Sequence, residues 1–235
     1  MKKVYNLIQY IGGILLCLAA GMAFAQTAPA HSAETPTHEI RTAEVTAQLL
    51  AWAPQGIAPG QPLWLGLHLK HAPGWHTYWK NPGQAGAATT LQWQLPAGST
   101  AGDIIWPTPS KFAVANIVNY GYSSDTLLAV PVQVQKLPDS TTLDVELQAQ
   151  WLACKAECLP QQGTLRLQLP IGQPITADTA TFTHTQQNTP QDLPQAKLQA
   201  TLSQGGQAVL FRATGLPADW QGKSLNAYPE TAEIF

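Results

Sequence analysis

The chain has 235 residues, of which 11% are charged and 45% are hydrophobic, and its formal net charge is −2. This composition argues against nucleic acid or an anionic membrane surface as a partner, because such binding depends on clustered Lys and Arg side chains. The 18 glycines and 19 prolines instead favour many short strands that are joined by tight turns.

Residues 1–25 have the pattern of a secretory signal peptide. Two lysines lie near the start, residues 11–20 are almost wholly apolar, and Ala23 and Ala25 are small residues of the kind found at a cleavage site. The apolar run is shorter than the roughly 20 residues that span a membrane, and a polar segment follows it. We therefore expect export to the periplasm and cleavage after Ala25, with an uncleaved anchor as the alternative. Residues 26–43 are expected to be flexible.

Between residues 44 and 169, apolar side chains recur with period two, and no persuasive helical period of 3.6 appears. In residues 63–70, for example, four leucines alternate with other side chains, so one face of this strand belongs to a core. Gly and Pro residues separate the segments. The pattern predicts an all-β, immunoglobulin-like antiparallel sandwich, with a closed barrel as the alternative. We expect strands at residues 44–52, 63–70, 75–79, 90–95, 103–106, 117–120, 126–135, 142–152 and 164–169.

The composition changes after this region. Residues 170–196 are rich in Pro, Gln, Thr and Asp and predict an extended, solvated linker. Residues 197–202 and 208–213 alternate again around two glycines, which predicts a hairpin that opens a second β domain. The span 197–235 is too short to bury a core of its own without a disulfide, a metal or a partner. We therefore expect this second domain to be incomplete and the chain to be a piece of a longer protein.

The cysteines carry the main chemical signal. Cys17 lies inside the predicted signal peptide, so the mature chain keeps Cys154 and Cys158. In an oxidising compartment, two cysteines four positions apart in a turn are able to form a disulfide. The bond would close a very small loop between two predicted strands, whereas structural disulfides usually join distant strands. Small exposed disulfides exchange readily, so the spacing favours thiol–disulfide exchange over a structural disulfide.

A metal site is a third interpretation. Two thiolates together with His68, His71 or His76 suit copper(I) or zinc. These histidines lie far from the cysteines in the sequence, however, and no zinc-finger spacing is present. We therefore expect neither a metal nor another cofactor. The rival function is a non-enzymatic periplasmic β-sandwich that binds copper or a protein partner and has a structural disulfide between Cys154 and Cys158.

Aromatic residues lie near two predicted turns. We predict that Trp75, Tyr78, Tyr120 and Tyr122 shield or cap the disulfide. The alternative is ordinary core packing, which we favour for at least one of Trp75 and Trp79.

Four stretches carry a resemblance to a known family. They are residues 74–83 (GWHTYWKNPG), 105–109 (IWPTP), 120–122 (YGY) and 151–160 (WLACKAECLP). Through them, the region from about residue 44 to 169 resembles the N-terminal periplasmic domain of the DsbD-like protein-disulfide reductases, especially the ScsB-type branch.

The resemblance implies a domain within a protein-disulfide reductase of the inner membrane, and copper tolerance is a further expectation. Electrons would come from a membrane-embedded reductase domain of the same full-length chain and pass to periplasmic thioredoxin-like proteins and other oxidised proteins. The better-studied DsbD branch has a longer spacing between its cysteines, and by analogy with it Cys158 would form the mixed disulfide. The charges of Lys155 and Glu157 instead favour Cys154 as the attacking thiolate, so both assignments stay open.

Overall fold

The computed structural model describes residues 37–231 apart from positions 115–116, 204, 206–207 and 221. The predicted signal peptide with Cys17, and most of the segment that was expected to be flexible, lie outside these residues. In the described part of the chain, no helix combines the length and the apolar character that crossing a membrane requires.

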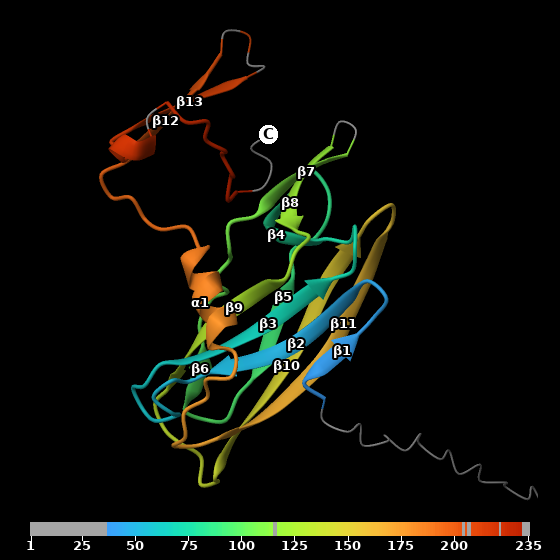
Figure 1. Ribbon diagram of the computed structural model, residues 1–235, viewed down its shortest axis with the longest axis vertical. Coiled ribbons are helices and arrows are strands. Elements are labelled where there is room, and N and C mark those ends of the chain that lie inside the picture. Colours follow the sequence, from blue (N-terminus) through green and yellow to red (C-terminus); the bar gives the residue numbers. More distant parts are fainter. Residues whose placement is uncertain (1–36, 115–116, 204, 206–207, 221, 232–235) are drawn as a thin grey trace, which may run out of the picture. The chain divides into compact units, whose positions relative to one another are not determined.

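Antiparallel strands make up most of the first part of the described chain. In chain order they are β1 (Glu39–Arg41), β2 (Val45–Trp52), β3 (Leu63–His71), β4 (Thr77–Gly83), β5 (Thr90–Gln94), β6 (Ser99–Ala101), β7 (Ser110–Val114), β8 (Ile117–Tyr122), β9 (Thr126–Val134), β10 (Thr142–Cys154) and β11 (Cys158–Pro170). One sheet has the order β1-β2-β3-β9-β6, a second has the order β11-β10-β5 and a third has the order β4-β8-β7 (Figure 1). The fold is therefore all-β and immunoglobulin-like, as the alternation predicts.

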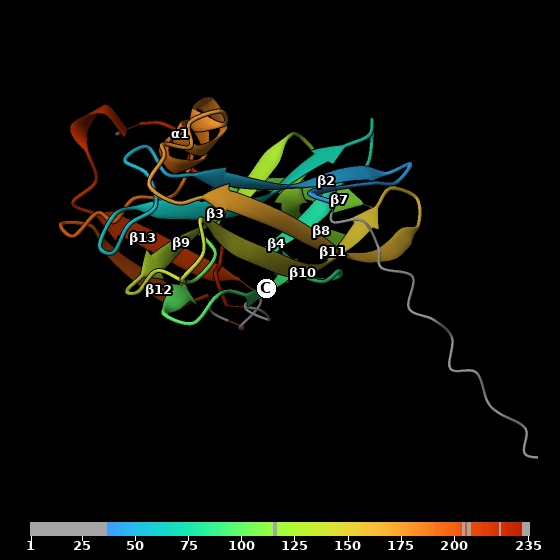
Figure 2. The ribbon, with the colours of Figure 1, turned by 90° about the horizontal axis from the view of Figure 1, so that it is seen from below.

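A single hydrophobic core joins the first two sheets. The leucines expected on one face of residues 63–70 are at most 2% exposed, and they belong to the same buried cluster as Leu143 and Leu147 of β10. Figure 2 shows β10 and β11 as a layer beside β2 and β3. Burial of one such side chain contributes about 1.5–3 kcal/mol, so the period-two pattern itself stabilises the contact between the layers.

Several strands differ from their predicted bounds. β4 begins at Thr77 and continues to Gly83, whereas a strand was expected at residues 75–79. Of the strand expected at residues 103–106, the structure has an isolated bridge between Ile105 and Ala129. β6 and β7 were not predicted, because each is a short run in which large apolar side chains do not alternate over enough positions. β11 begins at Cys158, because β10 and β11 stay paired as far as the cysteines.

The segment 170–196 is not extended throughout, in contrast to the expectation of a solvated linker. Ile175 pairs with Ala53, and helix α1 (Thr179–Gln187) follows. Phe182 of this helix is 1% exposed and belongs to a second buried cluster with Leu127, while its ring stacks on Trp52 at a centroid distance of 5.8 Å. One buried aromatic side chain is enough to hold this short polar helix against the sandwich. The overall composition of residues 170–196 does not reveal this contact.

The predicted hairpin after this segment is confirmed. β12 (Lys197–Leu202) pairs in antiparallel fashion with β13 (Val209–Thr214). Most side chains of both strands are exposed, and a short 3-10 helix, η1 (Ala218–Trp220), follows. That the hairpin opens an incomplete second domain stays a prediction.

Candidate functional site

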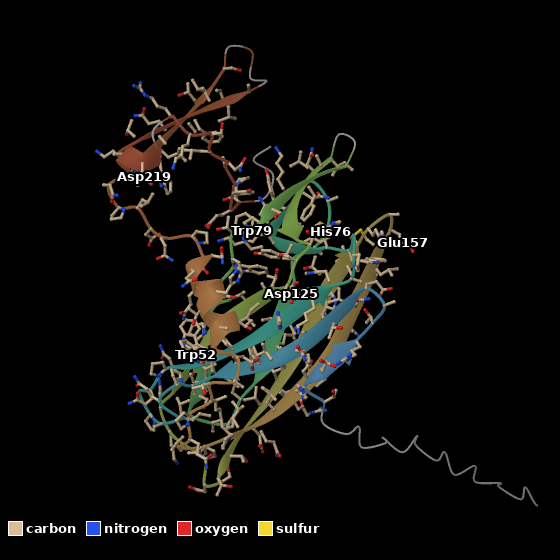
Figure 3. The ribbon with its side chains drawn as sticks, in the orientation of Figure 1. Trp52, His76, Trp79, Asp125, Glu157 and Asp219 are labelled. Atoms are coloured by element: carbon tan, nitrogen blue, oxygen red, sulfur yellow. A yellow bond between two sulfur atoms is a disulfide. The ribbon has the colours of Figure 1, made fainter. Side chains whose placement is uncertain are left out.

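The β10–β11 hairpin positions the two cysteines. Thirteen residue pairs keep the strands in register from Thr142 and Pro170 up to Cys154 and Cys158, which are the last pair. A turn closes the hairpin, and in it the Lys155 N–H donates to the carbonyl of Glu157 at 2.9 Å. The two sulfurs form a disulfide, with the Cα atoms 4.1 Å apart. Figure 3 shows this bond in yellow near the labelled His76 and Glu157. The disulfide that the sequence predicts is therefore confirmed.

The two cysteines differ sharply in exposure. Cys154 is only 2% exposed, whereas Cys158 is exposed. The cause is a short backbone bridge to His76, whose N–H donates to the carbonyl of Cys154 at 3.0 Å and whose carbonyl accepts from the N–H of Cys154 at 2.9 Å. The start of β4 therefore covers one cysteine and leaves the other open.

Tyr78 is in direct contact with the disulfide. Its hydroxyl donates to Sγ of Cys154 at 3.0 Å and lies 3.7 Å from Sγ of Cys158. The residue is 2% exposed, and burial raises the pKa of its phenol, so it remains a proton donor at neutral pH. The site thus holds a donor against the buried sulfur.

A glycine allows the chain to lie against the ring of Tyr78. Gly86 has φ of +105°, and a Cβ atom there would lie 2.3 Å from Cε1 of Tyr78. The neighbouring Ala88 forms a bridge with Tyr78. The loop after β4 therefore holds this tyrosine in place, and any larger residue at position 86 would displace its ring.

A second aromatic pair lies beside Tyr78. The ring of His76 stacks on Phe112 of β7, with centroids 4.8 Å apart and an interplanar angle of 19°. It also meets Tyr78 edge-on at 5.3 Å, and burial lowers the pKa of His76. The β7–β8 hairpin is thereby tied to the strand that covers Cys154. Sequence reasoning missed Phe112 and this role of His76, because only the pairing of β7 with β8 brings them together.

The predicted shielding residues do not all reach the disulfide. Within the described residues, Tyr78 is the member of the set with a contact to sulfur. Trp75 is half-buried and packs against the main core. Tyr120 is buried and meets Trp79 edge-on, while the buried hydroxyl of Tyr122 donates to the carbonyl of Pro107 at 2.8 Å. A shielding role for Trp75, Tyr120 and Tyr122 stays a prediction.

The histidines of the metal interpretation have other contacts. His71 contacts the carbonyl of Ser124 and the hydroxyl of Thr77, both at 2.9 Å, and His68 lies 4.0 Å from a carboxylate oxygen of Asp125. Burial lowers the pKa of both histidines. No group of three or more metal-binding side chains gathers among the residues that the structure describes.

The ammonium group of Lys155 also has a defined contact. It donates to the carbonyl of Pro73 at 3.2 Å, and its stem lies against Gly74, where a Cβ atom would come within 2.9 Å of Cε. Sequence proximity suggests that the positive charge of Lys155 favours a thiolate at Cys154. In the structure, this ammonium group instead donates a hydrogen bond to a backbone carbonyl.

Comparison with known proteins adds a family to this geometry. Residues 45–170, more than half of the chain, match the family described as thiol:disulfide interchange protein DsbD, N-terminal. Among solved structures, the crystal structure of the N-terminal periplasmic domain of ScsB from Proteus mirabilis is similar, with a TM-score of 0.53 and 22% identity. The likeness covers 70% of this chain and 63% of that one, and at this identity it supports the fold alone. None of the curated proteins matches.

The family match spans β2 to β11 and includes both cysteines and Tyr78. The disulfide seen in the structure therefore lies within the region that matches a family described by disulfide interchange. The chain belongs to the family of DsbD N-terminal domains of thiol:disulfide interchange proteins.

Proposed function

We propose that the chain is a thiol–disulfide exchange module in which Cys154 and Cys158 together accept and donate two electrons. The observation that carries the proposal is the asymmetry of the pair: Cys158 is exposed, whereas Cys154 is buried against the hydroxyl of Tyr78. Exchange needs one sulfur that a partner reaches and one that leaves and returns within the domain. The two cysteines have these two environments.

In the reducing direction, a thiolate of the electron donor attacks Sγ of Cys158. The bond between Cys158 and Cys154 breaks, and Cys154 leaves as a thiolate that the Tyr78 hydroxyl stabilises by hydrogen bonding. A second donor thiolate then attacks the mixed disulfide and releases Cys158. After two protons bind, the pair is a dithiol and the donor is a disulfide.

In the oxidising direction, the thiolate of Cys158 attacks a disulfide of the recipient protein and forms a mixed disulfide with it. Cys154 then attacks Sγ of Cys158, which restores the Cys154–Cys158 bond and releases the recipient as a dithiol. Exposure thus favours Cys158 as the attacking cysteine, in agreement with the family analogy and against the charges of its sequence neighbours.

A groove beside the hairpin offers a surface for a partner. Its lining includes Ala87, Ala88, Leu152 and Pro160. Leu152 and Pro160 are paired across β10 and β11, two positions before Cys154 and two after Cys158. We propose that an extended segment of the partner binds there and brings its sulfur to Cys158.

Family membership and the expected signal peptide support a periplasmic location. We propose that a membrane-embedded reductase domain, part of the same full-length protein, supplies the electrons. The recipients that we propose are periplasmic thioredoxin-like proteins and other oxidised periplasmic proteins. In this arrangement the chain acts as part of a protein-disulfide reductase and needs no bound cofactor of its own.

Trapping of mixed disulfides tests the proposal. Cys154→Ala leaves the exposed Cys158 without its resolving partner, so we expect it to accumulate thiol-linked complexes on non-reducing gels. Cys158→Ala leaves a buried thiol, so we expect far weaker trapping. If neither variant traps a protein and the native disulfide resists dithiol reductants in the folded state, the bond is structural and the proposal is wrong.

A further inference from the structure

Strand β4 has a second set of contacts, with residues that lie far along the chain. Tyr78 points to the disulfide, whereas the next residue, Trp79, and the nearby Asn81 contact residues 228–231. We propose that Trp79, Asn81 and Tyr120 form a docking site for this C-terminal segment, which acts as a strap that ties the chain after the sandwich to β4. The occupant is the chain's own Tyr228–Pro229–Glu230–Thr231 sequence.

Asn81 recognises the backbone of the strap. Its side-chain amide donates to the carbonyl of Pro229 at 2.8 Å and to that of Thr231 at 3.1 Å. Its own carbonyl oxygen accepts from the N–H of Gly83 at 3.0 Å, which orients the amide. Asn81 is only 3% exposed, and a buried amide is costly when it has no partner. The side chain therefore favours a face that the segment occupies over an empty one.

Aromatic contacts select the first residue of the strap. The ring of Tyr228 meets Tyr120 at 5.6 Å and Trp79 at 6.4 Å, in both cases edge-on. Trp79 and Tyr120 also meet each other edge-on, so the three rings form one cluster. Trp79 lies on β4 and is labelled in Figure 3. Such edge-on arrangements are favourable beyond the area that they bury, and they require an aromatic residue at position 228.

An ion pair selects the third residue. Nζ of Lys80 lies 2.7 Å from a carboxylate oxygen of Glu230. The same ammonium lies 5.4 Å from the centroid of the Trp79 ring. The site thus contacts an aromatic side chain, two backbone carbonyls and an acidic side chain within four consecutive residues. A chance surface contact would not combine these interactions.

Limited proteolysis by a glutamate-specific protease tests the docking in the 235-residue chain. The protease needs a free, extended backbone around Glu230, and the docked strap does not offer one. When opening is fast, the rate of cleavage follows the population of the open form. Asn81→Ala removes both hydrogen bonds to the strap, so we expect cleavage after Glu230 to become at least about fivefold faster.

Matched variants distinguish release of the strap from destabilisation of the whole domain. Asn119→Ala removes another buried asparagine, whose side chain accepts from the N–H of Ala85 and has no role in the proposal, and we expect it to leave cleavage after Glu230 unchanged. Tyr228→Ala changes only the strap and is expected to accelerate cleavage as Asn81→Ala does. Cleavage after Glu230 in the urea-unfolded chain gives the reference rate, and far-ultraviolet circular dichroism checks that each variant folds.

The outcomes decide the proposal in either direction. Acceleration by Asn81→Ala and Tyr228→Ala, with no effect of Asn119→Ala, supports the docked strap. The proposal is overturned if the folded, unaltered chain is already cleaved after Glu230 as fast as the urea-unfolded chain, or if all three variants behave alike. These results do not depend on whether the disulfide exchanges with partners.

Discussion

Substitution of Tyr78 by Phe tests the chemistry of the disulfide most directly. The change removes one oxygen atom, the hydroxyl that donates to Sγ of Cys154 at 3.0 Å, and keeps the buried ring. The hydroxyl stabilises a thiolate at Cys154 more than it stabilises the neutral sulfur of the disulfide. Its loss therefore raises the pKa of the Cys154 thiol, and it makes the reduced form less stable at a pH above that pKa, where this sulfur is a thiolate.

The size of the effect follows from the type of hydrogen bond. A hydrogen bond to a charged group contributes about 1.5–3 kcal/mol, and the environment is buried, so solvent compensates little for its loss. A tenfold change in a two-electron equilibrium corresponds to about 30 mV, or about 1.4 kcal/mol. At a pH where the Cys154 thiol is ionised, the reduction potential of Tyr78→Phe is therefore expected to be about 30–60 mV more negative than that of the unaltered chain.

Equilibration with a dithiol buffer at a pH above the Cys154 thiol pKa measures this potential, after free thiols are alkylated and counted by mass spectrometry. Tyr122→Phe is the matched control, because it removes a buried hydroxyl that donates to the carbonyl of Pro107 instead of to sulfur. In a Cys158→Ala background, the pH dependence of Cys154 alkylation gives the thiol pKa, which Tyr78→Phe should raise by about one unit or more. Equal potentials for Tyr78→Phe and Tyr122→Phe would refute the role assigned to Tyr78.

Three further predictions concern stability and are measured by urea unfolding. Gly86→Ala places a Cβ atom against a buried ring at positive φ, so it should destabilise by about 1–3 kcal/mol; Gly60→Ala, at positive φ with open space around it, should cost clearly less, and equal costs would contradict the steric argument. Phe182→Ala should lower the free energy of unfolding by about 3–5 kcal/mol, whereas an effect below about 1 kcal/mol would mean that α1 does not pack stably on the sandwich. Burial lowers the pKa of His76 below its ordinary value of 6.5, so the unfolded state binds more protons under mildly acidic conditions. The contribution of the neutral His76 ring to stability is therefore fully present above pH 6.5 and is lost as the pH falls through the lowered pKa. His76→Phe keeps a ring on Phe112 and should reduce this loss of stability at acidic pH. An unchanged dependence of stability on pH would argue against this role of His76.

The long alternating stretches were predictable because their information is local. Residues 142–152 and the leucines of residues 63–70 repeat with period two over enough positions to specify a strand and its buried face. The disulfide was predictable for a similar reason, since Cys154 and Cys158 flank a turn that ends a hairpin. The family resemblance also rested on short contiguous motifs, and the family match covers nearly the same residues.

Other features depend on residues that meet only after folding. The burial of Phe182 depends on the sheet that accepts it, and the helix around it is polar enough to suggest a solvated linker. Phe112 reaches His76 because β7 pairs with β8, and the strand pattern of the sequence does not include β7. For these residues, long-range packing outweighs the local composition on which sequence reasoning depends.

The sequence by itself determined the all-β architecture, the cysteine pair and the hairpin that holds it, because alternation and turn residues act over a few neighbouring positions. Only the tertiary structure decided that Cys154 is buried beneath β4 and Tyr78 while Cys158 stays exposed, because the covering strand lies more than 70 positions away in the chain. It likewise brought Tyr228 to Trp79 and Asn81. Contacts between such distant segments follow from the packing of whole layers and leave no periodic pattern in the sequence.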